Sequence, residues 1–154
     1  MSYLGLDRRL LLVGLLASAG ASATPLRITV SGAWTRPAAA GMNAAGYMTI
    51  ANHGHSPDRL TSAASPIAAR VTLHQSRMVG TISVMRPVEG IDVTSRGQIS
   101  LAPGGIHLML EGLKRPLQPG ERAPVTLLFQ HAGSVRAWLT VRTGTEAPTS
   151  GMRM

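Results

Sequence analysis

Two side chains with soft donor atoms, His107 and Met109, alternate with aliphatic residues in the segment Ile106–Leu110. Alternation of this kind predicts a strand with one buried face. Because successive side chains of a strand point to opposite faces, His107 and Met109 share the face that the aliphatic residues leave free. A histidine and a methionine on one face could offer an imidazole nitrogen and a thioether sulfur to the same metal ion.

His74 and Met85 lie out of phase with the apolar residues of their own segments in the same way. His74 directly follows the alternating run Val71–Leu73, and Met85 directly follows the run Ile82–Val84. Taken singly, an outward histidine is usually solvated, and an isolated exposed methionine is ordinary. Together the four residues form a set of outward soft donors, and we therefore group them as a candidate metal site that faces the surface.

The donor set is suited to copper. Thioether sulfur prefers Cu(I), whereas imidazole binds both Cu(I) and Cu(II). The chain has no cysteine, so a soft-metal site must use methionine and histidine. Two imidazoles and two thioethers are neutral, and they hold a metal ion less firmly than several thiolates would. Such a ligand set favours a carrier, whose ligands must be exchanged for those of a recipient. The expected cofactor is Cu(I), with Cu(II) as the alternative oxidation state.

The first 23 residues have the pattern of a cleavable export signal. Two arginines precede the apolar run Leu10–Leu16, and small residues follow. The run is too short for a membrane anchor, which needs roughly 20 residues. Cleavage after Ala19 or Ala23 fits, the second being preferred, and the paired arginines leave both the Sec and the twin-arginine routes open. We therefore expect a periplasmic protein without a membrane span after processing.

The composition narrows the class of partner. The 154-residue chain carries 15 Lys and Arg against 7 Asp and Glu, a net charge of +8, but only 3% of its residues are aromatic. Its arginines are scattered and its aromatic residues are few, so we do not expect a surface that stacks on nucleic-acid bases. We do expect the positive charge to attract an acidic protein partner. The few carboxylates form no catalytic motif, and we do not expect an enzyme.

Ten short segments separated by Gly-, Pro- and Asn-rich breaks predict an all-β barrel or sandwich. We expect a signal peptide at 1–23, one β-barrel domain at 24–142 and a flexible tail at 143–154. The predicted strands are Leu26–Val30, Gly46–Ala51, Arg59–Ser62, Ala69–His74, Gly80–Met85, Ile91–Val93, Gln98–Leu101, Ile106–Leu110, Pro124–Gln130 and Val135–Arg142.

The spacing of the four donors is itself a motif: ten residues separate His74 from Met85, twenty-one separate Met85 from His107, and one separates His107 from Met109. This pattern resembles that of the PCu(A)C family of periplasmic copper chaperones at all four positions. The resemblance implies a cupredoxin-like Greek-key β-barrel with these residues as the copper ligands. It also implies delivery of copper to an apo acceptor, such as an oxidase subunit in cytochrome c oxidase assembly or another copper chaperone. Further segments that resemble the family are Ala33–Arg36, Gly46–Ile50, Asp58–Leu60, Val71–His74, Met85–Val88 and Gly112–Lys114.

Two alternative functions use the same fold or ligands. A periplasmic copper buffer or tolerance protein would hold copper through the same residues, and the sequence separates it poorly from a chaperone. An electron-transfer cupredoxin fits less well, because blue-copper sites use a cysteine thiolate. Met78, near His74, and the tail residues Met152 and Met154 are candidate auxiliary ligands.

Overall fold

The computed structural model describes residues 27–144, which form ten strands and no helix. The predicted all-β class is therefore confirmed. The predicted signal segment and the tail beyond Gly144 lie outside the described residues. The strands are β1 (Ile28–Thr35), β2 (Ala44–Asn52), β3 (Asp58–Ala64), β4 (Ala68–Val79), β5 (Ile82–Pro87), β6 (Ile91–Val93), β7 (Gln98–Leu101), β8 (Ile106–Leu113), β9 (Arg122–Phe129) and β10 (Gly133–Val141).

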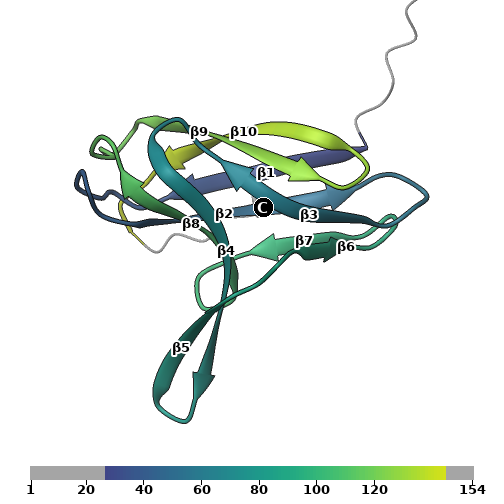
Figure 1. The fold of residues 1–154 in the computed structure, drawn as a ribbon, viewed down its shortest axis with the longest axis horizontal. Coiled ribbons are helices and arrows are strands. Elements are labelled where there is room, and N and C mark those ends of the chain that lie inside the picture. The colour runs from purple at the N-terminus through teal and green to yellow at the C-terminus, as the bar shows by residue number, and fades with distance from the viewer. Residues whose placement is uncertain (1–26, 145–154) are drawn as a thin grey trace, which may run out of the picture.

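Seven of these strands close into a barrel (Figure 1). The order β4-β8-β2-β1-β10-β9-β3 returns to β4 through the pair Ala63↔Val71. β5 pairs with β4, β6 pairs with β3, and β7 pairs with β2 outside this ring. Most neighbours are antiparallel, whereas β1 and β10 run parallel.

The barrel interior is filled by the aliphatic side chains of alternating positions. Leu108 and Leu110 of β8, Ile50 of β2 and Leu139 of β10 are fully buried. Burying a side chain of this size stabilises the fold by about 1.5–3 kcal/mol. This core fixes the phase of every barrel strand, so the intervening residues must point outward. His107 and Met109 are intervening residues of this kind.

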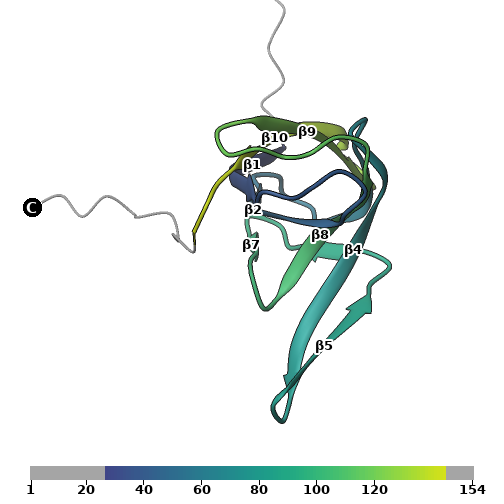
Figure 2. The same ribbon diagram turned by 90° about the vertical axis from the view of Figure 1, so that its left-hand side faces the viewer.

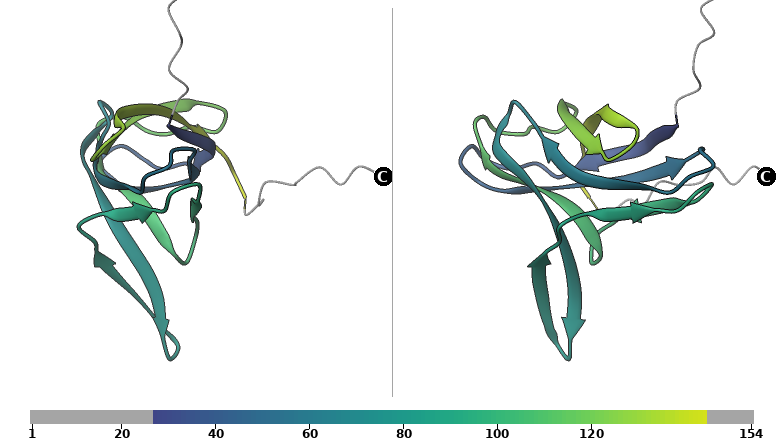
Figure 3. Two further views of the ribbon diagram at one scale, coloured as in Figure 1. Left: turned by 90° about the vertical axis from the view of Figure 1, so that its right-hand side faces the viewer. Right: turned by 45° about the vertical axis from the view of Figure 1, so that its right-hand side comes forward.

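β4 pairs with β5 from His74↔Pro87 to Val79↔Ile82, and beyond Gln75, the last residue of β4 that pairs with β8, the hairpin extends past the barrel as a two-stranded arm. Figures 2 and 3 show it projecting alone from one end of the molecule. Ile82 is largely exposed and Val84 is half-buried. The prediction that these two aliphatics occupy the core phase is wrong, because no second layer from residues 27–144 covers this part of the hairpin.

β1 contains the main irregularity of the barrel. Its register against β2 shifts between Ser31 and Trp34, and Gly32 there has φ 59°, a left-handed conformation that glycine adopts most easily. The strand therefore continues to Thr35 instead of ending at Val30 as predicted. Beyond this bulge, Trp34 points outward against Tyr47.

Candidate metal centre

His74 and His107 face each other directly across β4 and β8. Their ring centroids are 6.0 Å apart and the ring planes differ by 18°. With a metal–nitrogen distance of about 2.0 Å, two imidazoles on one ion have centroids no more than about 6.5 Å apart. The separation of the histidine pair therefore fits a shared metal ion.

The ring of His107 is oriented so that one nitrogen is free to bind a metal. Its Nδ1 lies 3.1 Å from the carbonyl oxygen of Gly105. A carbonyl can only accept, so Nδ1 carries the proton and Nε2 keeps its lone pair. Nε2 is buried and has no hydrogen-bond partner within the described residues. Leaving a buried polar atom unpaired costs about 1–3 kcal/mol, and a metal ion at Nε2 would remove that penalty.

His74 is oriented by a neighbour on its own strand. Its Nδ1 lies 3.2 Å from the hydroxyl oxygen of Thr72, two residues earlier on the same face of β4. Because this contact involves Nδ1, Nε2 is the nitrogen available to a metal. His74 is half-buried, and is therefore more accessible than His107.

Met109 lies on the same face of β8 as His107, opposite Thr72 of β4 and Ala45 of β2. It is half-buried and lines a cavity of about 350 Å³ together with Tyr47. Its thioether is thus held between two strands next to the histidine pair.

Met85 lies on the arm, opposite Ser76. Ser76 is two residues beyond His74 on the same face of β4, so Met85 is the diagonal neighbour of His74 across the hairpin. Met85 is 51% exposed. Met78, one step further along this face and opposite Ser83, is 63% exposed. The register therefore gathers the four predicted ligands and Met78 on one outward face of β8, β4 and β5.

Two features of this face are not evident from the sequence. His107 is only 3% exposed, so the prediction of a surface-facing ligand set is wrong for this residue. Tyr47 of β2 lies beside it with a centroid distance of 6.3 Å, and Trp34 of β1 packs on Tyr47 at 4.7 Å. The bulge in β1 brings Trp34 into this cover. The sequence offers one signal for this cover: Met48 is adjacent to Tyr47 and is buried in the core, which leaves Tyr47 facing outward.

The remaining histidines lie apart from this face. His53, His55 and His131 are exposed. His53 contacts the Thr29 hydroxyl, and His55 contacts Arg96. Within residues 27–144, no three His, Asp or Glu side chains gather into a group that could hold a metal. The auxiliary candidates Met152 and Met154 lie outside the described residues.

Comparison with known proteins agrees with this architecture. The sequence profile of the LpqE-like family of lipoproteins matches residues 28–141. The chain belongs to the LpqE-like family. It is also 35% identical over 103 residues to a protein described as lipoprotein Lxx21020 from Leifsonia xyli subsp. xyli (strain CTCB07), a match that covers 66% of this chain and 61% of that protein. The match thus spans less than two thirds of that relative.

Several solved structures of copper-binding proteins share the fold. The copper-bound PCuAC domain of PmoF2 is 26% identical with a TM-score of 0.64, covering 77% of this chain and 94% of that domain. The apo PCuAC domain of PmoF1 is 26% identical with a TM-score of 0.65, covering 77% and 95%. The Cu(I) form of DR1885 from Deinococcus radiodurans is 32% identical with a TM-score of 0.58, covering 80% and 83%. The resemblance to the PCu(A)C family thus extends from the four-residue motif to the barrel.

Between residues 27 and 144, no helix is long and apolar enough to cross a membrane.

Proposed function

We propose that this protein binds Cu(I) through His74, Met85, His107 and Met109 and passes it to an apo copper protein. The observation that carries the proposal is the buried Nε2 of His107, which has no hydrogen-bond partner within residues 27–144 and lies directly across from His74. Two thioethers on the same face complete a neutral donor set that suits Cu(I). The similarity to PCuAC domains solved with copper supports the same assignment.

The four ligands differ in accessibility, and this difference gives transfer a direction. His107 and Met109 are fixed on a core strand, whereas Met85 lies half-exposed on the arm. An incoming ligand from a recipient therefore reaches the Met85 side first, while His107 holds the ion until last. Stepwise exchange of this kind keeps Cu(I) bound throughout the transfer.

The recipient we propose is an exported copper protein, such as the copper-bearing subunit of cytochrome c oxidase or a second copper chaperone. The export signal predicted at 1–23 supports a periplasmic setting. A copper buffer would use the same ligands. It is distinguished by transfer: a chaperone loads an apo recipient faster than free dissociation of Cu(I) allows, whereas a buffer does not.

The test compares His107→Ala with His131→Ala, a matched loss of an exposed histidine outside the site. Competition against a chromophoric Cu(I) chelator gives the affinity, and metal analysis gives the stoichiometry. We expect one Cu(I) per chain, at least a tenfold weaker affinity for His107→Ala, and no change for His131→Ala. Parental affinity in His107→Ala would contradict the proposed ligand set.

Met78, Met152 and Met154 are proposed as auxiliary thioethers that collect Cu(I) ahead of the main site. Met78 lies on the ligand face of the arm, and the tail could add its methionines at high effective concentration. Met78→Leu and truncation after Pro148 should slow copper uptake without changing the final stoichiometry. Unchanged uptake in both variants would remove any role for these residues.

A further inference from the structure

The seam between β1 and β10 is mostly open. The two strands pair only at Trp34↔Thr140 and Thr35↔Val141. Before the bulge in β1, the two strands face each other without pairing. Within the described residues, no strand pairs with the facing edges, which are formed by Ile28–Gly32 and Gly133–Ala137. Unpaired edges of this kind are templates for an added strand.

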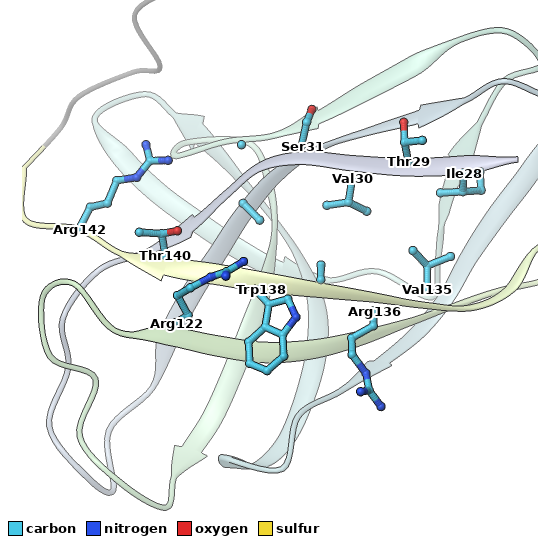
Figure 4. Close-up of a pocket in the computed structure, with 13 residues that line it drawn as sticks. Ile28, Thr29, Val30, Ser31, Arg122, Val135, Arg136, Trp138, Thr140 and Arg142 are labelled. Carbon is cyan, nitrogen blue, oxygen red and sulfur yellow. The ribbon is translucent and has the colours of Figure 1, made fainter. Parts of the chain in front are cut away.

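A cleft of about 580 Å³ fills this seam. Figure 4 shows Val30 of β1 and Val135 of β10 pointing toward one another across it, with Trp138 on the β10 side. Trp138 is 44% exposed, although large aromatic side chains are usually covered. The cleft therefore offers an apolar floor between two rows of backbone hydrogen-bonding groups.

The rim of the cleft is positively charged. Arg122, Arg136 and Arg142 line it, and no Asp or Glu does. Within residues 27–144 the ion pairs are Arg59–Asp92, Arg70–Glu111 and Arg115–Glu121, so the three rim arginines have no carboxylate partner there. Arg122 lies over the Trp138 ring at 5.6 Å, which leaves its guanidinium edge available to a bidentate carboxylate.

The cleft is connected to the metal face through a chain of side-chain contacts. Arg142 lies over the ring of Trp34 at 5.9 Å. Trp34 packs on Tyr47, and Tyr47 lies beside His107. Trp34, Tyr47 and His107 come from the adjacent strands β1, β2 and β8, and Arg142 directly follows β10. This chain of contacts links the cleft to the metal face, three strands away around the ring.

We propose that the β1–β10 cleft binds an extended, acidic segment of a partner protein by strand addition. The segment's backbone pairs with the free edges, its apolar side chains rest on Val30 and Val135, and its carboxylates bind the rim arginines. That this partner is the copper recipient rests on the proposed function. The docking itself does not, because none of the cleft residues is a proposed ligand.

The direct test uses a capped peptide of alternating Glu and Val, about eight residues long, the length of an ordinary strand. Calorimetry measures binding, and amide chemical shifts locate it. We expect shifts concentrated in β1 and β10, and at least about tenfold weaker binding by Arg122→Gln/Arg136→Gln. The control Arg77→Gln/Arg86→Gln removes the same charge from the arm and should bind as the parent does.

Three reference ligands identify the mode of binding. A Lys–Val peptide should not bind, and a Glu–Pro peptide, which keeps the charge but loses half its amide donors, should bind much more weakly. Equal binding of the Glu–Val and Glu–Pro peptides, or equal losses in the two double variants, would reduce the effect to general electrostatic attraction and overturn the proposal. Binding of anionic lipid vesicles through the rim arginines, with no peptide binding, would overturn it in favour of a membrane surface.

Copper measurements on the same variants separate this proposal from the proposed function. Arg122→Gln/Arg136→Gln should keep the parental Cu(I) affinity but transfer copper more slowly to its recipient. His107→Ala should keep the parental peptide affinity. If the peptide binds but the double variant transfers copper at the parental rate, the proposal that the copper recipient occupies the cleft would be wrong. A failure of His107→Ala to lose copper would count against the metal site alone.

Discussion

The imidazole Nδ1 of His107 donates to the carbonyl oxygen of Gly105 across 3.1 Å, which turns Nε2 into the face of the barrel where His74 lies. A hydrogen bond two residues back along the chain thus selects the tautomer that a metal requires.

The copper-free protein at neutral pH should hold His107 in the Nδ1–H tautomer. Long-range nitrogen–proton correlation spectra of the imidazole rings distinguish the two neutral forms. Addition of Cu(I) should then move the Nε2 resonance of His107 and leave Nδ1 protonated. An Nε2–H form in the copper-free protein would mean that the Gly105 contact does not prepare the ligand.

Met109→Leu should weaken Cu(I) binding more than Met85→Leu. Leucine conserves the side-chain volume in each case, so the comparison isolates the sulfur atom. Met109 is held between Thr72 and Ala45 beside the histidine pair, whereas Met85 is half-exposed on the arm and must be ordered on binding. We expect at least a tenfold loss for Met109→Leu and a smaller loss for Met85→Leu, measured by chelator competition. A larger loss for Met85→Leu than for Met109→Leu would mean that the arm, and not β8, supplies the stronger thioether ligand.

Asp58 should contribute stability that disappears in acid. Burial opposes its ionisation, but backbone N–H groups of His131, Arg59 and Ala132 outweigh burial and hold the pKa of this carboxyl below its usual 3.8. Since the folded-state pKa is lowered, the stabilisation is fully present above pH 3.8 and is lost as the pH falls through the folded value. Asp58→Asn should lower the free energy of unfolding at pH 7 by about 1–3 kcal/mol and flatten this acid dependence.

Asp92→Asn is the matched control for Asp58. Its carboxylate pairs with Arg59 at the surface, and its side chain is 76% exposed. Denaturant unfolding between pH 3 and pH 7 should show little difference from the parent, since exposed ion pairs contribute about 0–1 kcal/mol. Equal losses in both variants would argue against a special role for the backbone hydrogen bonds to Asp58.

Gly46→Val should destabilise the barrel and disturb the metal face together. A Cβ at Gly46 would lie 3.2 Å from Cδ1 of Leu139, so a larger side chain overpacks the core at a cost of about 1–3 kcal/mol. Gly46 is also the β2 partner of Leu108, which lies between His107 and Met109. Denaturant unfolding and Cu(I) competition should both show a loss. Thr49→Val, on the outward face of the same strand, should leave both nearly unchanged.

The strands and their faces are predictable from the sequence because one buried core sets a period of two. β6 and β7 have the predicted ends, and the alternation around Leu108 assigns His107 and Met109 to the outward face. What the sequence does not contain is the identity of neighbours across strands. The burial of His107 depends on Tyr47, which is sixty positions away in the chain and next to it only after β2 and β8 pair.

The arm and the open seam could not be predicted for a related reason. Alternation in Ile82–Val84 reports which side chains share a face, but not whether a second layer covers that face. Likewise, nothing in β1 or β10 indicates that the two strands meet in parallel for only two residue pairs. Both features depend on how the barrel closes, which involves every strand at once.

The arm carries half of the proposed methionine ligands yet contributes almost nothing to the core. Substitutions there escape the packing constraint that limits change elsewhere in a barrel of this size. Under the proposed function, changes in the arm would therefore alter how quickly copper enters and leaves, with the barrel, His74 and His107 kept intact. The proposed exchange of copper and the stability of the fold would then be separately adjustable.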